Sequence, residues 1–454
     1  MKIILVNPPA QQILETHDQP AHPHIGLGYL AAILEKNNFD CQIIDAKLER
    51  LTLEQTIEKI IQAKPMILGL TSMTHDLNQA IKIAKEVKKK NRKITIIIGG
   101  IHATALPYQT LKDYSCFDFL VFGEGEYILL ELLKRLKNSQ SVRGLAGVAI
   151  REKNRVSMNP SAKIIENLDA LPFPAWHFFP KARDYHIITA RGCPFLCIFC
   201  ASPYGRRVRE RSPENVISEL VQTIEKYQPK NYRFNDETFA FNQKRAIQIL
   251  NLIIKYKLAY KTNFAASMRA NKVDFALLKK MKKAGFVYID YGVETGDAGI
   301  LKRIKKGVTL KQTEKAIKET KKAKIRVGAN FIIGHPGETI KTVKKTINYA
   351  IKLNADLSAF GIMVPYPGTE VAKIAQKGEW GYKIISNNWS DYNKQFGNAL
   401  ELENIGRKSL ERLQALAYLK TYLFNFRIKN LISFIWQYRR AGLRLLLKQL
   451  KSEK

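Results

Sequence analysis

The chain has 454 residues, 46% of them hydrophobic, which suffices for the cores of about two or three domains. Its formal net charge of +34 is typical of proteins that bind nucleic acid. The lysines instead form runs typical of solvated helix faces, such as Lys88-Lys-Lys90, and no nucleic-acid-binding motif accompanies them. We therefore expect no nucleic-acid partner. No apolar run is long enough to cross a bilayer and no charged leader precedes one, so the sequence predicts a cytoplasmic protein.

Residues 1–140 alternate short β-rich apolar runs with helical patterns, which is typical of βαβ units around a parallel sheet. This rhythm predicts a doubly wound, flavodoxin-like domain whose ligand lies at the carboxyl ends of the strands. The expected strands are Ile3–Val6, Cys41–Asp45, Ile67–Leu70, Thr95–Ile98 and Phe119–Phe122. Turn-forming segments follow these strands at Asn7-Pro-Pro9, Thr71-Ser-Met-Thr74, Gly99-Gly-Ile-His102 and Gly123-Glu-Gly-Glu126.

Residues 141–182 are expected to form a small hairpin, over 144–167, and a stiff proline-rich linker. A second α/β series fills 183–378 and predicts an open, partial (β/α)6 barrel of TIM type, with its chemistry at the C-terminal ends of the strands. From about 385 onward the pattern is helical, and 379–454 is expected as a basic helical C-terminal region. The strands of the barrel are expected at His186–Ala190, Tyr232–Asn235, Asn263–Ala266, Tyr288–Val293, Val327–Ile333 and Ala359–Val364.

Three of the five cysteines, Cys193, Cys197 and Cys200, follow the first barrel strand at the spacing C-x3-C-x2-C. Three thiolates can hold three irons of a [4Fe–4S] cluster and leave the fourth iron open to an outside ligand. Structural zinc uses four nitrogen or sulfur ligands, and neither His177 nor His186 stands at a usual zinc-site spacing. The spacing therefore favours an open cluster. The other two cysteines lie far apart, so a disulfide framework is not expected.

With this motif, residues 185–370 resemble the radical SAM family. In that family S-adenosylmethionine (SAM) chelates the open iron, and an electron from the cluster cleaves it to methionine and a 5′-deoxyadenosyl radical. The resemblance implies that Phe199 borders the adenine, that Arg269 contacts the SAM carboxylate and that Glu294 lies near the ribose. The full set of implied SAM contacts is Phe199, Asp236, Ser267, Arg269, Glu294 and Gly334.

Two acidic residues and one histidine at the strand ends also fit structural roles. An acidic residue at the start of a helix often serves as its cap, so for Asp236 and Glu338 a cap or turn role is favoured equally with ligand contact. His335 has an ordinary pKa suited to proton transfer, although a packing role is the favoured interpretation. No catalytic side chain is expected beyond the cofactors.

The N-terminal domain resembles the cobalamin-binding domain of one radical SAM family. The resemblance rests on Asn7-Pro-Pro9, His24-Ile-Gly-Leu-Gly-Tyr-Leu30, Gly99-Gly-Ile-His-Ala-Thr104 and Phe122-Gly-Glu-Gly-Glu126. The D-x-H-x-x-G loop that gives cobalt a histidine in cobalamin mutases is absent, which agrees with this family. A degenerate domain that binds nothing is the alternative. The implied cobalamin contacts are Pro9, Thr71, Ser72, Thr74, Gly99, Gly100, His102, Gly123 and Glu124.

The resemblance implies an enzyme that uses a [4Fe–4S] cluster, SAM and cobalamin to methylate an unactivated carbon of a small molecule or lipid. It also implies an electron donor such as flavodoxin or ferredoxin. Ring closure or rearrangement with the same cofactors is the alternative. Transfer-RNA methylthiolation is less favoured. Enzymes of that class have three cysteines in the N-terminal domain and a C-terminal RNA-binding β-barrel, and this sequence indicates neither.

The C-terminal tail combines basic and apolar residues over 405–454, with Phe434, Ile435 and Trp436 next to Arg439. Such an amphipathic basic segment suits a peripheral contact with an anionic membrane surface. Packing of the apolar residues on the open side of the barrel is the other interpretation, and the favoured one.

Overall fold

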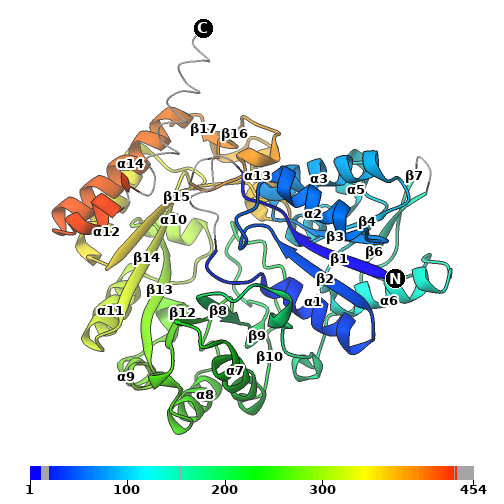
Figure 1. Ribbon diagram of the computed structural model, residues 1–454. Coiled ribbons are helices and arrows are strands. Elements are labelled where there is room, and N and C mark those ends of the chain that lie inside the picture. The colour runs from blue at the N-terminus through cyan, green and yellow to red at the C-terminus, as the bar shows by residue number, and fades with distance from the viewer. Residues whose placement is uncertain (12–19, 153–154, 396, 434, 437–454) are drawn as a thin grey trace. The chain divides into compact units, whose positions relative to one another are not determined.

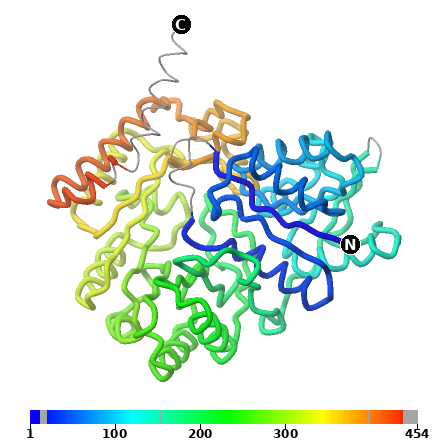
Figure 2. The backbone as a smooth tube through the Cα atoms, viewed as in Figure 1, coloured from blue at the N-terminus to red at the C-terminus, as the bar shows by residue number. Residues whose placement is uncertain are grey.

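A computed structural model describes residues 1–11, 20–152, 155–395, 397–433 and 435–436. The chain divides into two compact units, one of residues 1–186 with 201–211 and the other of residues 187–200 with 212–454. It therefore leaves the second unit directly after Cys200 and returns to it at Ser212. The path can be followed by colour in Figures 1 and 2. None of the described helices has the length and apolarity that a membrane crossing requires.

The first unit is built on a seven-stranded sheet in the order β2-β1-β3-β4-β5-β6-β7. Its first five strands are parallel and, apart from the edge strand β2, mostly buried, with helices on both faces (Figure 1). All five expected strands are present, and their order is that of flavodoxin-like folds, so this prediction is confirmed. The strands are β1 (Lys2–Asn7), β2 (Asp40–Asp45), β3 (Ile67–Thr71), β4 (Thr95–Gly99) and β5 (Phe119–Val121).

The first two helices of this unit begin at side chains that cap their N-termini. His24 accepts a hydrogen bond from the backbone of the first helix, and Thr52 forms a capping box with Gln55 at the second. The helices are α1 (Ile25–Lys36), α2 (Leu53–Ala63), α3 (Leu77–Lys90), α4 (Ile101–Ala105), α5 (Pro107–Asp113) and α6 (Gly125–Lys137).

The expected hairpin is present as β6 (Val148–Glu152) and β7 (Arg155–Met158), which pair antiparallel. β6 also pairs antiparallel with β5, so the hairpin extends the parallel sheet. The sequence did not indicate this extension. The expected turn at Lys153-Asn154 lies outside the described residues.

The second unit is built around a six-stranded sheet in the order β15-β14-β13-β12-β11-β8. The pairings from β11 to β15 are parallel, and the sheet ends at β8 and β15 as an open, partial barrel does. The partial barrel is therefore confirmed. Its strands are β8 (Asp184–Ile187), β11 (Asn231–Phe234), β12 (Asn263–Met268), β13 (Phe286–Glu294), β14 (Arg326–Ile333) and β15 (Leu357–Ile362).

Alternation along these strands separates an apolar outer face from a polar inner face. On the outer face Tyr291 shares a 2.8 Å hydrogen bond with Thr320, which lies on the helix that precedes β14. Asp290 and Asn330 lie on the opposite, inner face, where they make a polar contact of 3.4 Å. The helices on the outer side are α7 (Pro213–Tyr227), α8 (Gln243–Lys255), α9 (Phe275–Lys283), α11 (Leu310–Lys322) and α12 (Ile340–Leu353). The short helix α10 (Ala298–Arg303) follows the carboxyl end of β13.

The C-terminal region is helical, as expected, but its long helix begins later than residue 385. α13 (Glu370–Gln376) comes first, and β16 (Tyr382–Ile384) then pairs antiparallel with β17 (Leu400–Leu402). The long helix, α14 (Arg407–Phe424), follows this pair. The expected helical start was wrong because the short strands carry too few residues to interrupt a helical pattern.

α14 covers the edge strand β15. Tyr418 Oη accepts from Phe360 N at 3.0 Å, and Tyr422 Oη donates to Ser358 O at 3.1 Å. Gln414 Nε2 donates to Phe360 O at 2.7 Å. These side chains occupy backbone groups that an edge strand otherwise leaves open to another strand.

Candidate active site

The cysteine loop follows β9 (Ala190–Arg191), where it begins at Gly192. All three of its cysteines are free thiols, of which Cys197 is buried and Cys193 and Cys200 are half-buried. Burial raises the pKa of the Cys193 thiol, and the charges of Glu237, Cys200 and Cys197 raise it further. Three neighbouring thiolates therefore need a positive centre between them, which bound iron supplies.

A single metal ion fits this loop less well than a cluster does. Among the described residues, no three His, Cys, Asp or Glu side chains gather closely enough to hold one ion. A [4Fe–4S] cluster has a different requirement, because each thiolate binds a separate iron. The loop fits the cluster that its spacing predicted, and ligation by Cys193, Cys197 and Cys200 stays a prediction.

Arg269 follows β12 and lies beside the cysteine loop. Its Nη1 is 3.9 Å from Cys197 Sγ, and its guanidinium lies 3.6 Å from the centroid of the Phe195 ring. The side chain is buried, and Nε has no hydrogen-bond partner among the described residues. A buried guanidinium with a spare donor is suited to a carboxylate. The predicted contact of Arg269 with the SAM carboxylate fits this geometry.

Glu294 ends β13 in a left-handed conformation, with φ of 70°. Its Oε1 accepts from Lys306 Nζ at 2.7 Å in a buried ion pair. Burial favours the neutral acid, but the Lys306 ammonium outweighs it and holds the pKa of Glu294 below its usual value. Phe199 lies close to the same pair, because Lys306 Nζ is 5.9 Å from its ring centroid. The two residues implied to face the ribose and the adenine are thus neighbours.

Asp236 follows β11 and holds the start of the cysteine loop. Its carboxylate accepts from Thr189 N at 2.6 Å, from Thr189 Oγ1 at 2.5 Å and from Ala190 N at 3.1 Å. Arg245 donates to Thr189 O from the other side. These contacts are those of a residue that positions the loop, and a direct SAM contact by Asp236 stays a prediction.

Glu338 folds back onto the loop that follows β14. Its Oε2 accepts from Gly334 N at 2.6 Å and from His335 N at 3.0 Å, so these contacts support a turn role. Burial raises the pKa of Glu338 to about 7. His335 is fully buried, which lowers its pKa to about 4, and its Nε2 lies 3.4 Å from Glu294 O. A neutral, enclosed imidazole agrees with the packing role.

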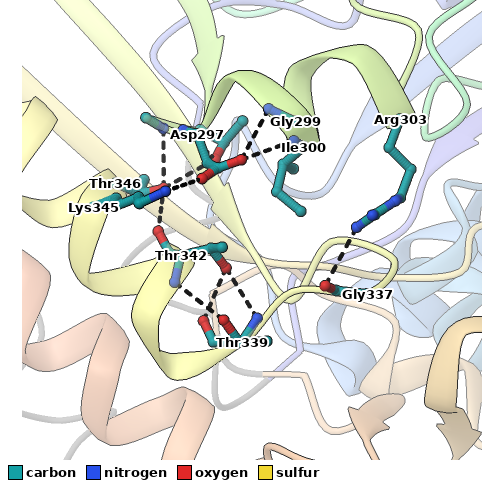
Figure 3. A network of polar contacts seen from close by, with 11 residues as sticks. Asp297, Gly299, Ile300, Arg303, Gly337, Thr339, Thr342, Lys345 and Thr346 are labelled. Atoms are coloured by element: carbon teal, nitrogen blue, oxygen red, sulfur yellow. Dashed lines mark hydrogen bonds and ion pairs between the residues drawn. The ribbon is translucent and has the colours of Figure 1, made fainter.

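The same loop is held from outside by other elements. Arg303 of α10 donates to Pro336 O at 2.8 Å. It also donates to Gly337 O at 3.3 Å, the contact drawn in Figure 3. Tyr382 Oη donates to Gly334 O at 2.9 Å. α10 itself is held to α12 by the ion pair between Asp297 and Lys345, also seen in Figure 3. Gly334, one of the implied SAM contacts, therefore lies in a fixed turn, with φ of 86°.

Ser267 belongs to a polar ladder on the inner face of the barrel. Its Oγ accepts from Arg233 Nη2 at 2.7 Å and donates to Asp290 Oδ2 at 3.0 Å. Arg233 is also paired with Asp290. The sequence singled out Ser267 only, although a charge between Tyr232 and Phe234 in an apolar strand indicates an inner-face position. A SAM contact by Ser267 stays a prediction.

In the first unit the implied cobalamin contacts gather at the carboxyl ends of β1, β3, β4 and β5. Ser72 N donates to Gly99 O at 3.1 Å, and His102 N donates to Ser72 O at 3.2 Å, so the loops after β3 and β4 are joined. Gly100 has φ of 97°, and a Cβ there would lie 2.7 Å from Ser72 N, so only glycine fits. The residues gathered at this edge are Pro9, Thr71, Ser72, Thr74, Gly99, Gly100, His102, Gly123 and Glu124.

Two side chains at this edge bear on cobalamin. Ser72 Oγ is buried and has no hydrogen-bond partner among the described residues, as expected of a group that a ligand satisfies. His102 is buried, which lowers its pKa to about 4, and its Nδ1 lies 3.4 Å from Thr74 Oγ1. The edge fits a bound ligand, and the individual contacts stay predictions.

Glu124 has a partner that the sequence did not indicate. Its two carboxylate oxygens accept from Arg209 Nη1 at 2.7 Å and from Arg209 Nη2 at 2.9 Å, and one of them also accepts from Ile165 N. Both side chains of the pair are almost fully buried. Arg209 belongs to the segment that follows the cysteine loop and joins the first unit. A cobalamin contact by Glu124 stays a prediction beside this structural role.

Comparison with known proteins identifies two domains in the chain. The B12 binding domain model matches residues 14–133, and the Radical SAM superfamily model matches residues 187–350. An uncharacterized methyltransferase of Pyrococcus horikoshii is 34% identical over 96% of this chain and 95% of its own length. The anaerobic magnesium-protoporphyrin IX monomethyl ester cyclase of Rubrivivax gelatinosus is 28% identical over 82% of this chain and 68% of its own.

The fold is also similar to a solved structure, that of the radical S-adenosylmethionine methyltransferase TsrM from Kitasatospora setae. The TM-score is 0.73 at 18% identity, and the match covers 93% of this chain and 88% of that one. Together with the 34% identity over nearly the whole chain, the two matched domains settle the family. The chain belongs to the cobalamin-binding-domain-containing radical SAM family, whose cofactors are a [4Fe–4S] cluster, SAM and cobalamin.

Proposed function

We propose that this enzyme methylates an unactivated carbon of a small molecule or lipid. The observation that carries the proposal is the combination, in one chain, of a three-cysteine loop beside a buried arginine and a cobalamin-type sheet edge with an unsatisfied hydroxyl at Ser72. When bound, the cofactors supply a radical that removes hydrogen and a methyl group that takes its place. After one-electron reduction of the cobalamin by the electron donor, a second SAM would supply the replacement methyl group.

The side chains bind and orient rather than react. Arg269 would hold the SAM carboxylate, and the Glu294–Lys306 pair would present an oxygen to the ribose. Asp236 fixes the start of the cysteine loop through three hydrogen bonds, and Glu338 fixes the turn at Gly334. Positioning of this kind suits radical chemistry, because the reacting carbon must meet one hydrogen-abstracting centre and one methyl donor in turn.

Ring closure is the second candidate, and the similarity to the Rubrivivax gelatinosus cyclase favours it. Methylation is preferred because the more similar Pyrococcus horikoshii relative, at 34% against 28% identity, is described as a methyltransferase.

The test is an anaerobic incubation of the reconstituted enzyme with methylcobalamin, reductant, trideuteromethyl-SAM and a fractionated cell extract. A methyltransferase gives a product that carries the deuterated methyl group, whereas a cyclase gives an unlabelled product with altered hydrogen content. The variant with Cys193, Cys197 and Cys200 replaced by alanine should form neither. Cys41→Ala and Cys116→Ala, which alter buried cysteines outside the loop, are the matched controls. Absence of any product from every extract fraction would contradict the proposal.

Two partners belong to the same proposal. Cluster reduction requires an electron donor, for which a flavodoxin or ferredoxin is proposed. A peripheral membrane contact is proposed through exposed apolar residues beyond α14, of which Phe426 is 90% exposed and Ile428 and Ile432 are more than half exposed. Of the residues singled out in this tail from the sequence, Phe434 and Arg439 lie outside the described residues. Flotation with anionic vesicles that is equal for the wild type and for F426S/I428S/I432S would contradict this contact.

A further inference from the structure

Lys394 lies on the chain between β16 and β17 and reaches the inner face of the barrel. Its carbonyl accepts from Ile362 N at 2.8 Å, at the C-terminal end of the edge strand β15. Its side chain crosses Gly361, where an added Cβ would lie 3.2 Å from Lys394 Cβ and 3.5 Å from Cδ. Glycine at position 361 therefore leaves the room that the lysine stem occupies.

Position 361 faces the inside of the barrel. Gly361 is paired with Ile332 of β14, two residues after Asn330, so it lies on the same face as Asn330 and Asp290. The neighbouring Phe360 points outward, where it stacks edge-on with Tyr418 of α14. The lysine stem thus runs along the inner face at the end of the strands where the SAM contacts are predicted.

The ammonium group acts electrostatically on two residues of the candidate site. Burial is the main cause of the lowered pKa of His335, and Lys394 adds to that lowering. For Glu294, burial opposes ionisation, but Lys306 and, to a lesser degree, Lys394 lower the pKa. Lys394 is therefore close to the group implied to face the SAM ribose.

Other cations of the inner face have an acidic partner, but Lys394 has none within the described part of the chain. Lys306 is paired with Glu294, and Arg233 is paired with Asp290. Among the same described residues, Lys394 Nζ makes no hydrogen bond or ion pair, and its nearest aromatic contact is the Tyr366 ring centroid at 6.0 Å. A half-buried ammonium without an acidic partner gains most from an anion that arrives with the ligand.

We propose that Lys394 binds a carboxylate or phosphate group of the substrate, so that the molecule methylated in this barrel is an anion. The identification of the bound anion as the substrate rests on the proposed function. The binding of an anion by Lys394 rests on its unpaired ammonium group. SAM also carries a carboxylate, which the geometry of Arg269 already suits. The experiment must therefore separate the two anions.

The binding experiment uses the reconstituted holoenzyme with SAM present and inorganic pyrophosphate as the probe, measured by anaerobic calorimetry. Lys394→Met should weaken pyrophosphate binding at least tenfold, and Lys394→Arg should restore it to within about threefold of the wild type. Lys383→Met is the matched control, because Lys383 is an exposed lysine on β16 and the variant loses the same charge. Equal weakening in both methionine variants, or no pyrophosphate binding by the wild type, would overturn the proposal.

Steady-state SAM cleavage without substrate shows whether Lys394 binds the substrate anion or the SAM carboxylate. Lys394→Met should keep the KM for SAM within about twofold of the wild type, with an unchanged cluster absorbance and thermal midpoint. A tenfold rise in that KM would assign the lysine to SAM and overturn the substrate assignment. If no deuterated product forms while Lys394→Met still weakens pyrophosphate binding, the proposed methylation is contradicted and the anion site is supported.

Discussion

The buried ion pair between Glu124 and Arg209 gives the sharpest stability prediction. The side chain of Glu124 is 4% exposed and that of Arg209 is 3% exposed. Glu124 accepts hydrogen bonds from Arg209 Nη1, Arg209 Nη2 and Ile165 N. In Glu124→Ala, Arg209 keeps only the carbonyls of Ile165 and Tyr204 as acceptors among the described residues. Removing one partner of a buried pair costs about 3–5 kcal/mol, because the other charge stays buried without compensation.

The assay is thermal unfolding of the cobalamin-free protein, followed by tryptophan fluorescence, with Trp176 buried in the first unit as a reporter. For a unit of about 200 residues, each kcal/mol shifts the midpoint by about 2–4 °C, so a fall of at least about 6 °C is expected. Glu166→Ala is the matched control. Its pair with Arg207 is 55% and 69% exposed and is worth less than about 1 kcal/mol.

The double variant E124A/R209A distinguishes an ion pair from separate effects. Removing both charges should recover part of the loss, because no unpaired guanidinium then stays buried. Equal midpoints for Glu124→Ala and Glu166→Ala would refute the reasoning. If Glu124→Ala kept its midpoint and lost cobalamin binding, Glu124 would instead act mainly as a cobalamin contact.

Three further predictions concern the cofactors and pH. The reconstituted protein should hold one [4Fe–4S] cluster, and replacing Cys193, Cys197 and Cys200 together should remove it; iron near eight atoms per chain, about twice one cluster, would contradict this. Bound cob(II)alamin should show no nitrogen superhyperfine splitting in its electron paramagnetic resonance spectrum, and a clear nitrogen triplet would refute the absence of a histidine ligand. The pKa of Glu338, raised from 4.5 to about 7, makes the folded state hold a proton that the unfolded state releases. The free energy of unfolding should therefore fall by up to about 3 kcal/mol as pH rises from about 4.5 to about 7. Glu338→Gln should lose this pH dependence. His335, with its lowered pKa, gives the opposite slope, so the difference between variant and wild type is the quantity to measure.

The strands could be placed from sequence because each is a short apolar run bounded by turn residues. Ile3–Val6 and Val327–Ile333 are found almost at their expected positions. α10 and α13 were not expected, because six or seven residues are too few to display a helical period. The pairing of β6 with β5 was not expected either, since strand pairing depends on which edge is free after folding.

Some residues of the candidate site also follow from a local sequence pattern, whereas others are brought together only by folding. The cysteine spacing lies within one loop and could be recognised from eight consecutive residues. Glu124 and Arg209 are 85 residues apart, and no local pattern joins them. Their pair forms because a buried carboxylate must be compensated, and folding brings the arginine of the segment after Cys200 into the first unit.

Glu294 and Lys394 differ in whether another residue of the chain compensates their charge. Both residues lie on the inner side of the barrel, and burial opposes the ionised form of Glu294. Glu294 is stabilised within the chain, because Lys306 lies twelve residues further on and meets it at 2.7 Å. The charge of Lys394 acts on Glu294 and His335, but its ammonium group makes no hydrogen bond or ion pair within the described residues. A charge that the fold has compensated can hold a cofactor in place, whereas one left uncompensated gains stability only when a ligand of opposite charge binds. The distribution of pairs inside the barrel therefore carries information about the substrate that neither the cysteine motif nor the family contains.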